Sequence, residues 1–303
     1  MYRRGQLAEV RSAAEIAATL DASGKLDGVP FMPEMIRYCG LRIRVACHAD
    51  RVCVVGHGMR RMKGALFLQN ARCDGAFHGD CQRGCLLFWM EAWLKPVRGG
   101  DTPQAPASVL DDAAADRLRQ SPTRDGERYL CQSTALLAAT RPLSRWNISA
   151  FLKEIWRGEL TLRDFLKIVA RTMLHRFLRM SPDRKLAGTA LRPSPGALDL
   201  AGGEWGRVKD WQALAAHVNA NGDNRGLAFR PTMNASVGGR FQVRFPITRM
   251  ILEQNGKMVH LSHTVVLKHV TCKGVCAANC PRDEHLFWRE SWLERVAAPD
   301  DGA

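Results

Sequence analysis

Short stretches of alternating polar and apolar residues mark the expected strands of this chain. Residues 42–45 and 240–245 alternate in this way, and apolar runs follow at 66–68 and 264–267. Alternation with a period of two turns one face of a strand to the core and the other to solvent. The pattern predicts a small antiparallel sheet or barrel in each half of the chain, for which an SH3-like barrel is the nearest simple architecture.

Capping residues predict a helix before each of these sheets. Ser12 and Glu15 form a capping box ahead of Ile16 and Leu20, and Asp210 begins the corresponding stretch in the second half. In such a box the Ser side chain accepts from the backbone of the Glu, and the Glu side chain reaches back to the cap. Each sheet is therefore expected to follow a short helix.

The middle of the chain predicts a longer amphipathic helix that starts at Thr161. One face carries the apolar residues Leu162, Leu166, Val169, Met173 and Phe177. Another face carries a row of basic residues spaced four apart, Arg163, Lys167, Arg171, His175 and Arg179. Such a row could follow a phosphate backbone, but a solvated helix face produces it as well, and the second interpretation is favoured.

The two halves are copies of one another. Without a gap, and at one constant offset, Cys73-x-Gly75 recurs as Cys272-x-Gly274, and the match continues through the residues that follow. The later pairs are Cys81/Cys280, Arg83/Arg282, Phe88/Phe287, Trp89/Trp288, Glu91/Glu290, Trp93/Trp292, Leu94/Leu293 and Val97/Val296. Upstream the offset shortens by one residue near 54–60, which indicates a loop there. The sequence therefore indicates a tandem duplication, and the two halves are expected to share one fold.

The repeat defines the expected organisation of the chain. Repeat 1 covers 6–97 and repeat 2 covers 204–296, about ninety residues each, within the usual size of a domain. Residues 98–203 have no copy and form a linker and helical insert between them. The fold class is therefore α+β, in which each repeat joins an N-terminal helix, a small antiparallel sheet and a Cys-rich loop.

Composition narrows the class of protein. The 303 residues are 46% hydrophobic and 24% charged, as in ordinary globular proteins, and no apolar run is long enough to span a membrane. The start of the chain lacks the apolar core of a secretory signal, so the cytoplasm is the expected compartment. The formal charge of +14 favours phosphate or another polyanion as a partner, although an arginine-rich composition would give the same charge.

The first Cys-rich loop has the residue types of a metal site. Cys73, His78, Cys81 and Cys85 stand within thirteen residues, with Cys131 as a further candidate from the insert. Thiolates and an imidazole together suit a tetrahedral zinc ion, whereas a set made only of thiolates suits zinc or an iron–sulfur cluster. A reversible dithiol is the alternative to metal binding.

The second loop keeps three thiols by a different spacing. Its residues are Cys272, Cys276 and Cys280, while the place of Cys85 is taken by Glu284. Three protein ligands would leave one position for water, substrate or the unique iron of a cluster. The other three cysteines, Cys39, Cys47 and Cys53, face apolar residues in the second copy and are interpreted as buried thiols of the core.

The closing Trp pairs admit two conformations. Trp89 and Trp93 share a face at helical spacing and also at strand spacing, as do Trp288 and Trp292. In either case they are expected to wall the core beside the metal sites, and a role in stacking on bases is the weaker alternative.

Three functions follow from these patterns. The first is a duplicated metal-binding protein, with zinc or an iron–sulfur cluster, that serves as a binding or accessory module for a nucleic acid or a partner enzyme. The second is an iron–sulfur redox or biosynthetic enzyme that acts at the three cysteines of repeat 2. The third is a structural zinc protein. No phosphate-binding glycine loop, nucleophile elbow or zinc-protease motif is present in the sequence.

Overall fold

The computed structural model describes residues 2–97, 112–143, 148–177, 185–274 and 279–299, and all structural statements below concern these residues. The chain divides into two compact units. The first comprises Met1–Ala170 with two segments of repeat 2, Ile251–Met258 and Cys280–Arg282. The second comprises Arg171–Met250, Val259–Asn279 and Asp283–Ala303.

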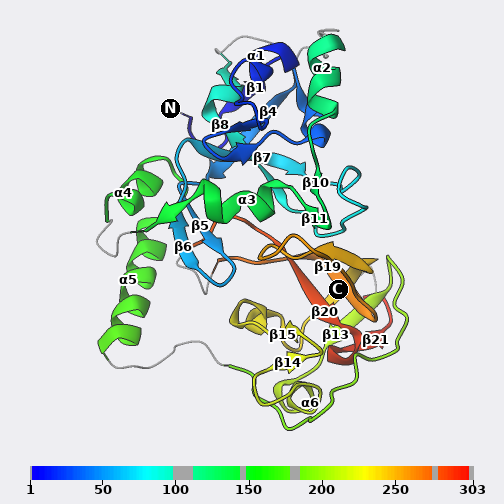
Figure 1. The fold of residues 1–303 in the computed structure, drawn as a ribbon. Coiled ribbons are helices and arrows are strands. Elements are labelled where there is room, and N and C mark those ends of the chain that lie inside the picture. The colour runs from blue at the N-terminus through cyan, green and yellow to red at the C-terminus, as the bar shows by residue number, and fades with distance from the viewer. Residues whose placement is uncertain (1, 98–111, 144–147, 178–184, 275–278, 300–303) are drawn as a thin grey trace. The chain divides into compact units, whose positions relative to one another are not determined.

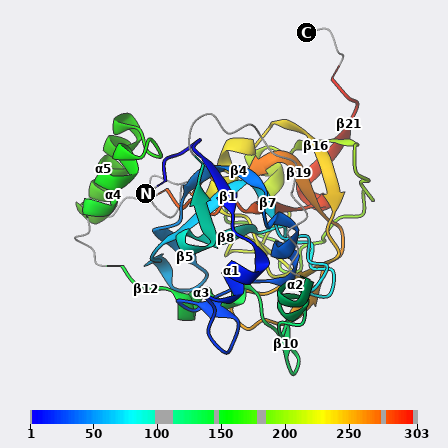
Figure 2. The ribbon, with the colours of Figure 1, turned by 90° about the horizontal axis from the view of Figure 1, so that it is seen from above.

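A five-stranded antiparallel sheet forms the centre of repeat 1, in the order β8-β7-β4-β1-β9. Figure 2 labels β1, β4, β7 and β8 of this sheet. Its strands are β1 (Leu7–Val10), β4 (Arg42–His48), β7 (Ala65–Arg72), β8 (Leu86–Met90) and β9 (Leu94–Pro96). Around it lie α1 (Ala13–Ala17), the hairpin of β2 (Lys25–Leu26) and β3 (Val29–Pro30), and two 3₁₀ helices, η1 (Pro33–Tyr38) and η2 (Glu91–Trp93). A second hairpin is formed by β5 (Arg51–Val54) and β6 (Gly58–Arg61).

Repeat 2 has a sheet of the same topology, in the order β20-β19-β16-β13-β21 (Figure 1). Its strands are β13 (Trp205–Val208), β16 (Arg240–Pro246), β19 (Thr264–Thr271), β20 (His285–Arg289) and β21 (Leu293–Val296). The other elements are α6 (Trp211–Ala215), β14 (Asp223–Asn224), β15 (Leu227–Ala228), η3 (Pro231–Ser236), β17 (Arg249–Ile251), β18 (Met258–His260) and η5 (Glu290–Trp292). The predicted strands and the α+β class are confirmed at this level, and the SH3-like barrel stays a prediction.

The two sheets share irregularities as well as strand order. The register of β4 on β7 shifts between Val45 and Cys47, and that of β16 on β19 shifts at the corresponding residues, Val243 and Phe245. The one-residue change in offset falls in the turn between β5 and β6, where the sequence predicted a loop. A bulge re-aims a strand, and both sheets carry one at corresponding residues.

The Trp pairs lie in the cores of their repeats. Trp89 and Trp93 are fully buried, and Phe31 meets both edge-on, with ring centroids 6.4 and 5.3 Å away. Phe229 meets the buried Trp288 and Trp292 in the same way, at 6.0 and 5.5 Å. The closing segment is a strand, a 3₁₀ turn and a strand, which resolves the ambiguity of its spacing. Rings buried this completely have no face on which a base could stack.

The described part of the insert contains helices and short strands. Its elements are α2 (Asp112–Arg119), β10 (Arg124–Asp125), β11 (Arg128–Tyr129), α3 (Gln132–Ala139), β12 (Arg141–Pro142), α4 (Ile148–Trp156) and α5 (Leu162–Phe177). Arg51 of β5 holds α4 through a two-pronged contact with Glu154, at 2.8 and 2.7 Å. Within the described part of the chain, no helix has the length and apolar character needed to cross a bilayer.

Candidate metal centre

The Cys-rich loop of repeat 1 leaves the end of β7 and turns tightly at Gly75. The Gly75 backbone has a φ of +77°, and its carbonyl accepts from the N–H groups of His78 and Asp80 at 2.8 and 3.1 Å. A Cβ atom at this position would lie 2.1 Å from the carbonyl oxygen of Cys81. Only glycine fits such a position without a shift of the backbone. The loop then closes on itself, because the Cys73 N–H donates to the Cys85 carbonyl at 2.9 Å.

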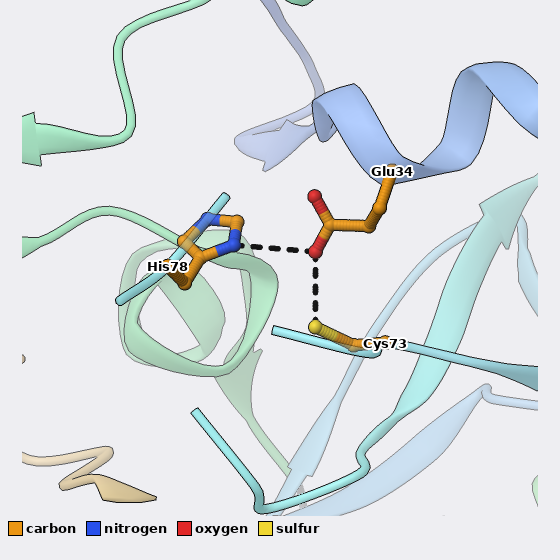
Figure 3. Close-up of side chains that lie close together, drawn as sticks. All are labelled: Glu34, Cys73 and His78. Carbon is orange, nitrogen blue, oxygen red and sulfur yellow. Dashed lines mark hydrogen bonds and ion pairs between the residues drawn. The ribbon is translucent and has the colours of Figure 1, made fainter. Parts of the chain in front are cut away.

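This turn brings Cys73 and His78 to a carboxylate that the sequence analysis did not single out (Figure 3). Glu34 enters from η1, which begins at Pro33. Its Oε1 atom lies 2.9 Å from the Sγ of Cys73 and 3.2 Å from the Nδ1 of His78. The three potential ligand atoms all lie within 4.8 Å of one another. Sulfur, nitrogen and oxygen thus converge on one point inside the unit.

Two of the three residues of the site are buried. Glu34 is 3% exposed and His78 is 1% exposed, while Cys73 is partly buried. Carboxylates are almost never fully buried unless they are paired, since leaving water costs a charge several kcal/mol. The burial of Glu34 therefore calls for a positive charge or hydrogen-bond donors beside its carboxylate.

His78 is oriented so that one ring nitrogen faces the carboxylate. Its Nε2 lies 3.0 Å from the carbonyl oxygen of Leu130, which can only accept, so Nε2 carries a proton. In the neutral ring Nδ1 then has a lone pair directed at Glu34. Apart from the 3.2 Å contact between Nδ1 and the Oε1 of Glu34, neither Nδ1 nor the Oε2 of Glu34 has a hydrogen-bond partner among the described residues, although both are buried. A proton on Nδ1 or a bound cation would satisfy these atoms, and a second ring nitrogen held by a carbonyl is typical of metal-binding histidines.

The ionisation of the site reflects its burial. Burial raises the pKa of the Cys73 thiol strongly, and the neighbouring charge of Glu34 raises it further. For Glu34 burial also acts to raise the pKa, but hydrogen bonding and charge interaction with His78 lower it overall. These shifts favour a charged carboxylate at Glu34 and a protonated thiol at Cys73.

The other predicted ligands of repeat 1 take different places. Cys85 is near enough to Cys73 for their charges to interact, but it lies outside the compact group. The Sγ of Cys81 accepts from the N–H of Ile251 at 3.3 Å. Cys131, which lies in the insert, is the N-cap of α3; burial raises the pKa of its thiol, and the nearby Cys81 adds a smaller effect in the same direction. Among the described residues, Cys73 and His78 are thus the predicted ligands brought together with a third donor.

Repeat 2 keeps two of the backbone hydrogen bonds of this loop but lacks the side chains of Glu34 and His78. The Cys272 N–H donates to the Glu284 carbonyl at 2.7 Å, and the Asn279 N–H donates to the Gly274 carbonyl at 3.1 Å, as their counterparts do in repeat 1. The place of Glu34 is taken by Thr232 and that of His78 by Ala277. Cys276 lies outside the described residues, so the predicted set of Cys272, Cys276 and Cys280 stays a prediction.

Cys280 contacts another thiol. Its Sγ lies 3.2 Å from the Sγ of Cys53, which the sequence analysis had interpreted as a core residue. Both belong to the first unit. The repeat alignment offered no signal for this contact, because Cys53 faces Ile251 in the copy.

A second group of potential ligands lies in unit 2 and has another explanation. It consists of Asp199, His263 and Glu290. The buried carboxylate of Glu290 already accepts three backbone N–H bonds, from residues 198–200, at 2.8, 3.0 and 3.0 Å. Its charge is satisfied by the chain itself, and Asp199 is exposed, so this group fits a metal ion less well than the first.

Comparison of the chain with protein-family models, with curated proteins and with solved structures finds no match.

Proposed function

We propose that this chain is a metal-binding protein whose first repeat holds one zinc ion between Glu34, Cys73 and His78. The observation that supports it most is the convergence of a buried carboxylate, the Nδ1 of a buried imidazole and a thiol, whose ligand atoms all lie within 4.8 Å of one another. Zinc accepts sulfur, nitrogen and oxygen donors together, at about 2.3 Å for sulfur and 2.0–2.2 Å for the others. The donors lie close enough for small side-chain movements to produce these distances.

The mixed donor set favours zinc over an iron–sulfur cluster. Clusters are bound by thiolates, with histidine in some cases, whereas this group contains a single cysteine. Cys85, the neighbouring thiol, is the natural fourth ligand. Calcium and magnesium prefer sites made of oxygen atoms, which this one is not.

The proposed role is structural rather than catalytic. Glu34 and His78 are buried, and such burial favours a structural ion over one that a substrate reaches. Bound zinc would tie η1 to the loop after β7, and the free energy of metal binding would then stabilise repeat 1. The repeats would serve as a binding or accessory module. A nucleic-acid partner remains a proposal based on net charge, and a steep salt dependence of binding would support it.

The test is the metal content of the full chain and of two matched variants. We expect about one zinc per chain in the wild type, loss of that zinc in Cys73→Ser, and its retention in Cys272→Ser, the same change in repeat 2. A colourless protein is expected throughout. If Cys272→Ser also removes one equivalent, the two-centre arrangement suggested by the sequence is correct instead. If both variants keep the metal content of the wild type, or none of the three proteins binds zinc, the proposal fails.

A further inference from the structure

Two thiols that are far apart in sequence meet in the first unit. The Sγ atoms of Cys53 and Cys280 lie 3.2 Å apart, across a separation of 227 residues. The N–H of Cys53 donates to the Sγ of Cys280 at 3.2 Å, and the guanidinium of Arg282 donates to the carbonyl of Cys53 at 2.6 Å. Backbone and side-chain bonds on both sides therefore hold the two sulfurs together.

This backbone contact has a counterpart in which the two repeats exchange roles. There Cys81, the counterpart of Cys280, accepts from the N–H of Ile251, the counterpart of Cys53. An isoleucine is thus sufficient to shape the backbone contact. The sulfur of Cys53 is therefore not needed for the backbone contact. It does allow a redox reaction between two thiols, which the pair of Cys81 and Ile251 cannot undergo.

We propose that Cys53 and Cys280 form a reversible disulfide when the chain meets a small disulfide oxidant of the glutathione class. The S–S bond of the oxidant breaks and the Cys53–Cys280 bond forms. The two protein thiols give up two electrons and two protons, which the two released small thiols take up. The reaction passes through a mixed disulfide that the second cysteine resolves.

The exposure of the two cysteines determines which thiol reacts first. Cys53 is partly exposed, whereas Cys280 is 6% exposed, so the oxidant reaches Cys53 first. Cys280 then attacks the mixed disulfide from within the unit. A disulfide has a sulfur separation of about 2.05 Å, so the sulfurs must approach by about 1 Å, a change that side-chain rotation can supply.

The disulfide would fix Cys280–Arg282 to β5. Arg282 also binds the buried carboxylate of Glu253, at 2.7 Å. Oxidation would therefore fasten a segment of repeat 2 within the first unit, beside an ion pair that already holds it. Closing so long a loop restricts the unfolded chain and raises stability.

The experiment treats the full chain with glutathione disulfide, blocks remaining thiols by alkylation and maps the linked peptides by mass spectrometry. We expect a Cys53–Cys280 peptide, a rise in melting temperature of about 5 °C or more, and reversal of both by dithiothreitol. Cys53→Ile, which installs the residue of repeat 2, should abolish the peptide and the rise. Cys53→Ser serves the same purpose if isoleucine does not fit, and Cys47→Ser is the control that should keep both.

Several outcomes would overturn the inference. These are the absence of the linked peptide in the wild type, a rise in melting temperature that persists in both Cys53 variants, and a loss of bound zinc in Cys280→Ser. The last would show that Cys280 is a metal ligand. Because the zinc group of repeat 1 does not include Cys53 or Cys280, either proposal can fail while the other stands.

Discussion

In repeat 1 the second residue of η1 is the buried Glu34, and in repeat 2 the same place of η3 holds Thr232. The structural elements around this position correspond in the two repeats. The strand order, the bulges, the Phe–Trp contacts and the hydrogen bonds that close the Cys-rich loops correspond residue by residue. The comparison teaches that the two repeats share a scaffold and the cysteine at Cys73, and that two of the proposed metal donors, Glu34 and His78, lie where the side chains differ.

Two segments of repeat 2, Ile251–Met258 and Cys280–Arg282, belong to the first unit. Glu253 accepts from Arg83 at 3.0 Å and from Arg282, and these two arginines are counterparts in the repeats. Ser133 of α3 and the N–H of Val55 donate to the same carboxylate at 3.1 and 2.9 Å. One carboxylate thus joins four segments, and repeat 1 has only Val55 in the corresponding place.

The largest expected effect is that of Glu253→Ala. Glu253 and Arg282 have side chains only 2% and 4% exposed, so the change leaves a buried guanidinium without its carboxylate. We expect a loss of about 3–5 kcal/mol in the free energy of unfolding, measured by urea denaturation. Glu294→Ala, which removes a half-exposed carboxylate 3.9 Å from Arg207, should cost about 0–1 kcal/mol. Equal costs would contradict the assignment of Glu253 as the link between segments.

A smaller effect distinguishes the two aromatic cores. Trp93 donates its indole N–H to Thr19 at 3.0 Å, whereas the indole nitrogen of Trp292 makes no hydrogen bond. Trp93→Phe and Trp292→Phe remove the same volume, but the first also loses a hydrogen bond. We expect Trp93→Phe to cost about 1 kcal/mol more, measured by thermal or urea unfolding. If Trp292→Phe proves the more costly, the two cores do not correspond as closely as their geometry suggests.

The smallest effect concerns the helix caps. Glu15 completes the capping box of α1 and binds Lys95 at 2.9 Å, whereas its counterpart in α6 is Ala213. Burial acts to raise the pKa of Glu15, but its bonds with Lys95 and Ser12 lower that pKa to about 2. The charge therefore contributes stability above the unfolded pKa of about 4.3, and this contribution is lost as the pH falls toward 2.

We expect Glu15→Gln to cost about 0.5 kcal/mol at pH 7, since the side chain is more than one-third exposed, and almost nothing near pH 2. Unfolding curves at several pH values measure the difference. Ala213→Gln, the matched change in α6, should leave the pH dependence of stability unchanged. A cost for Glu15→Gln that does not vary between pH 7 and pH 2 would argue against the ionic contribution.

The parts of the fold that depend on local pattern could be predicted from the sequence. The strands, the Ser12 cap and the long helix of the insert follow from periodicity and capping, because those signals act over a few residues. The closing Trp segment could not be decided, because Trp89 and Trp93 share a face in either conformation. The barrel type depends on how strands pair over long separations, which one sequence does not specify.

The site could be predicted only in part. The loop between Cys73 and Cys81 was recognisable because its glycines and cysteines are duplicated. Glu34 was missed because it lies in a separate 3₁₀ helix and has no acidic counterpart in repeat 2. Cys53 was set aside because an apolar residue faces it in the copy, and only the fold shows that Cys280 approaches it.

X-ray absorption at the zinc edge of the metal-loaded full chain tests the central claim most directly. The account predicts about one zinc per chain, with nitrogen or oxygen neighbours at about 2.0–2.2 Å and one or two sulfurs at about 2.3 Å, from Glu34, His78, Cys73 and Cys85. A shell of sulfur alone, or zinc bound at full occupancy in a chain that carries both Glu34→Gln and His78→Ala, would contradict it.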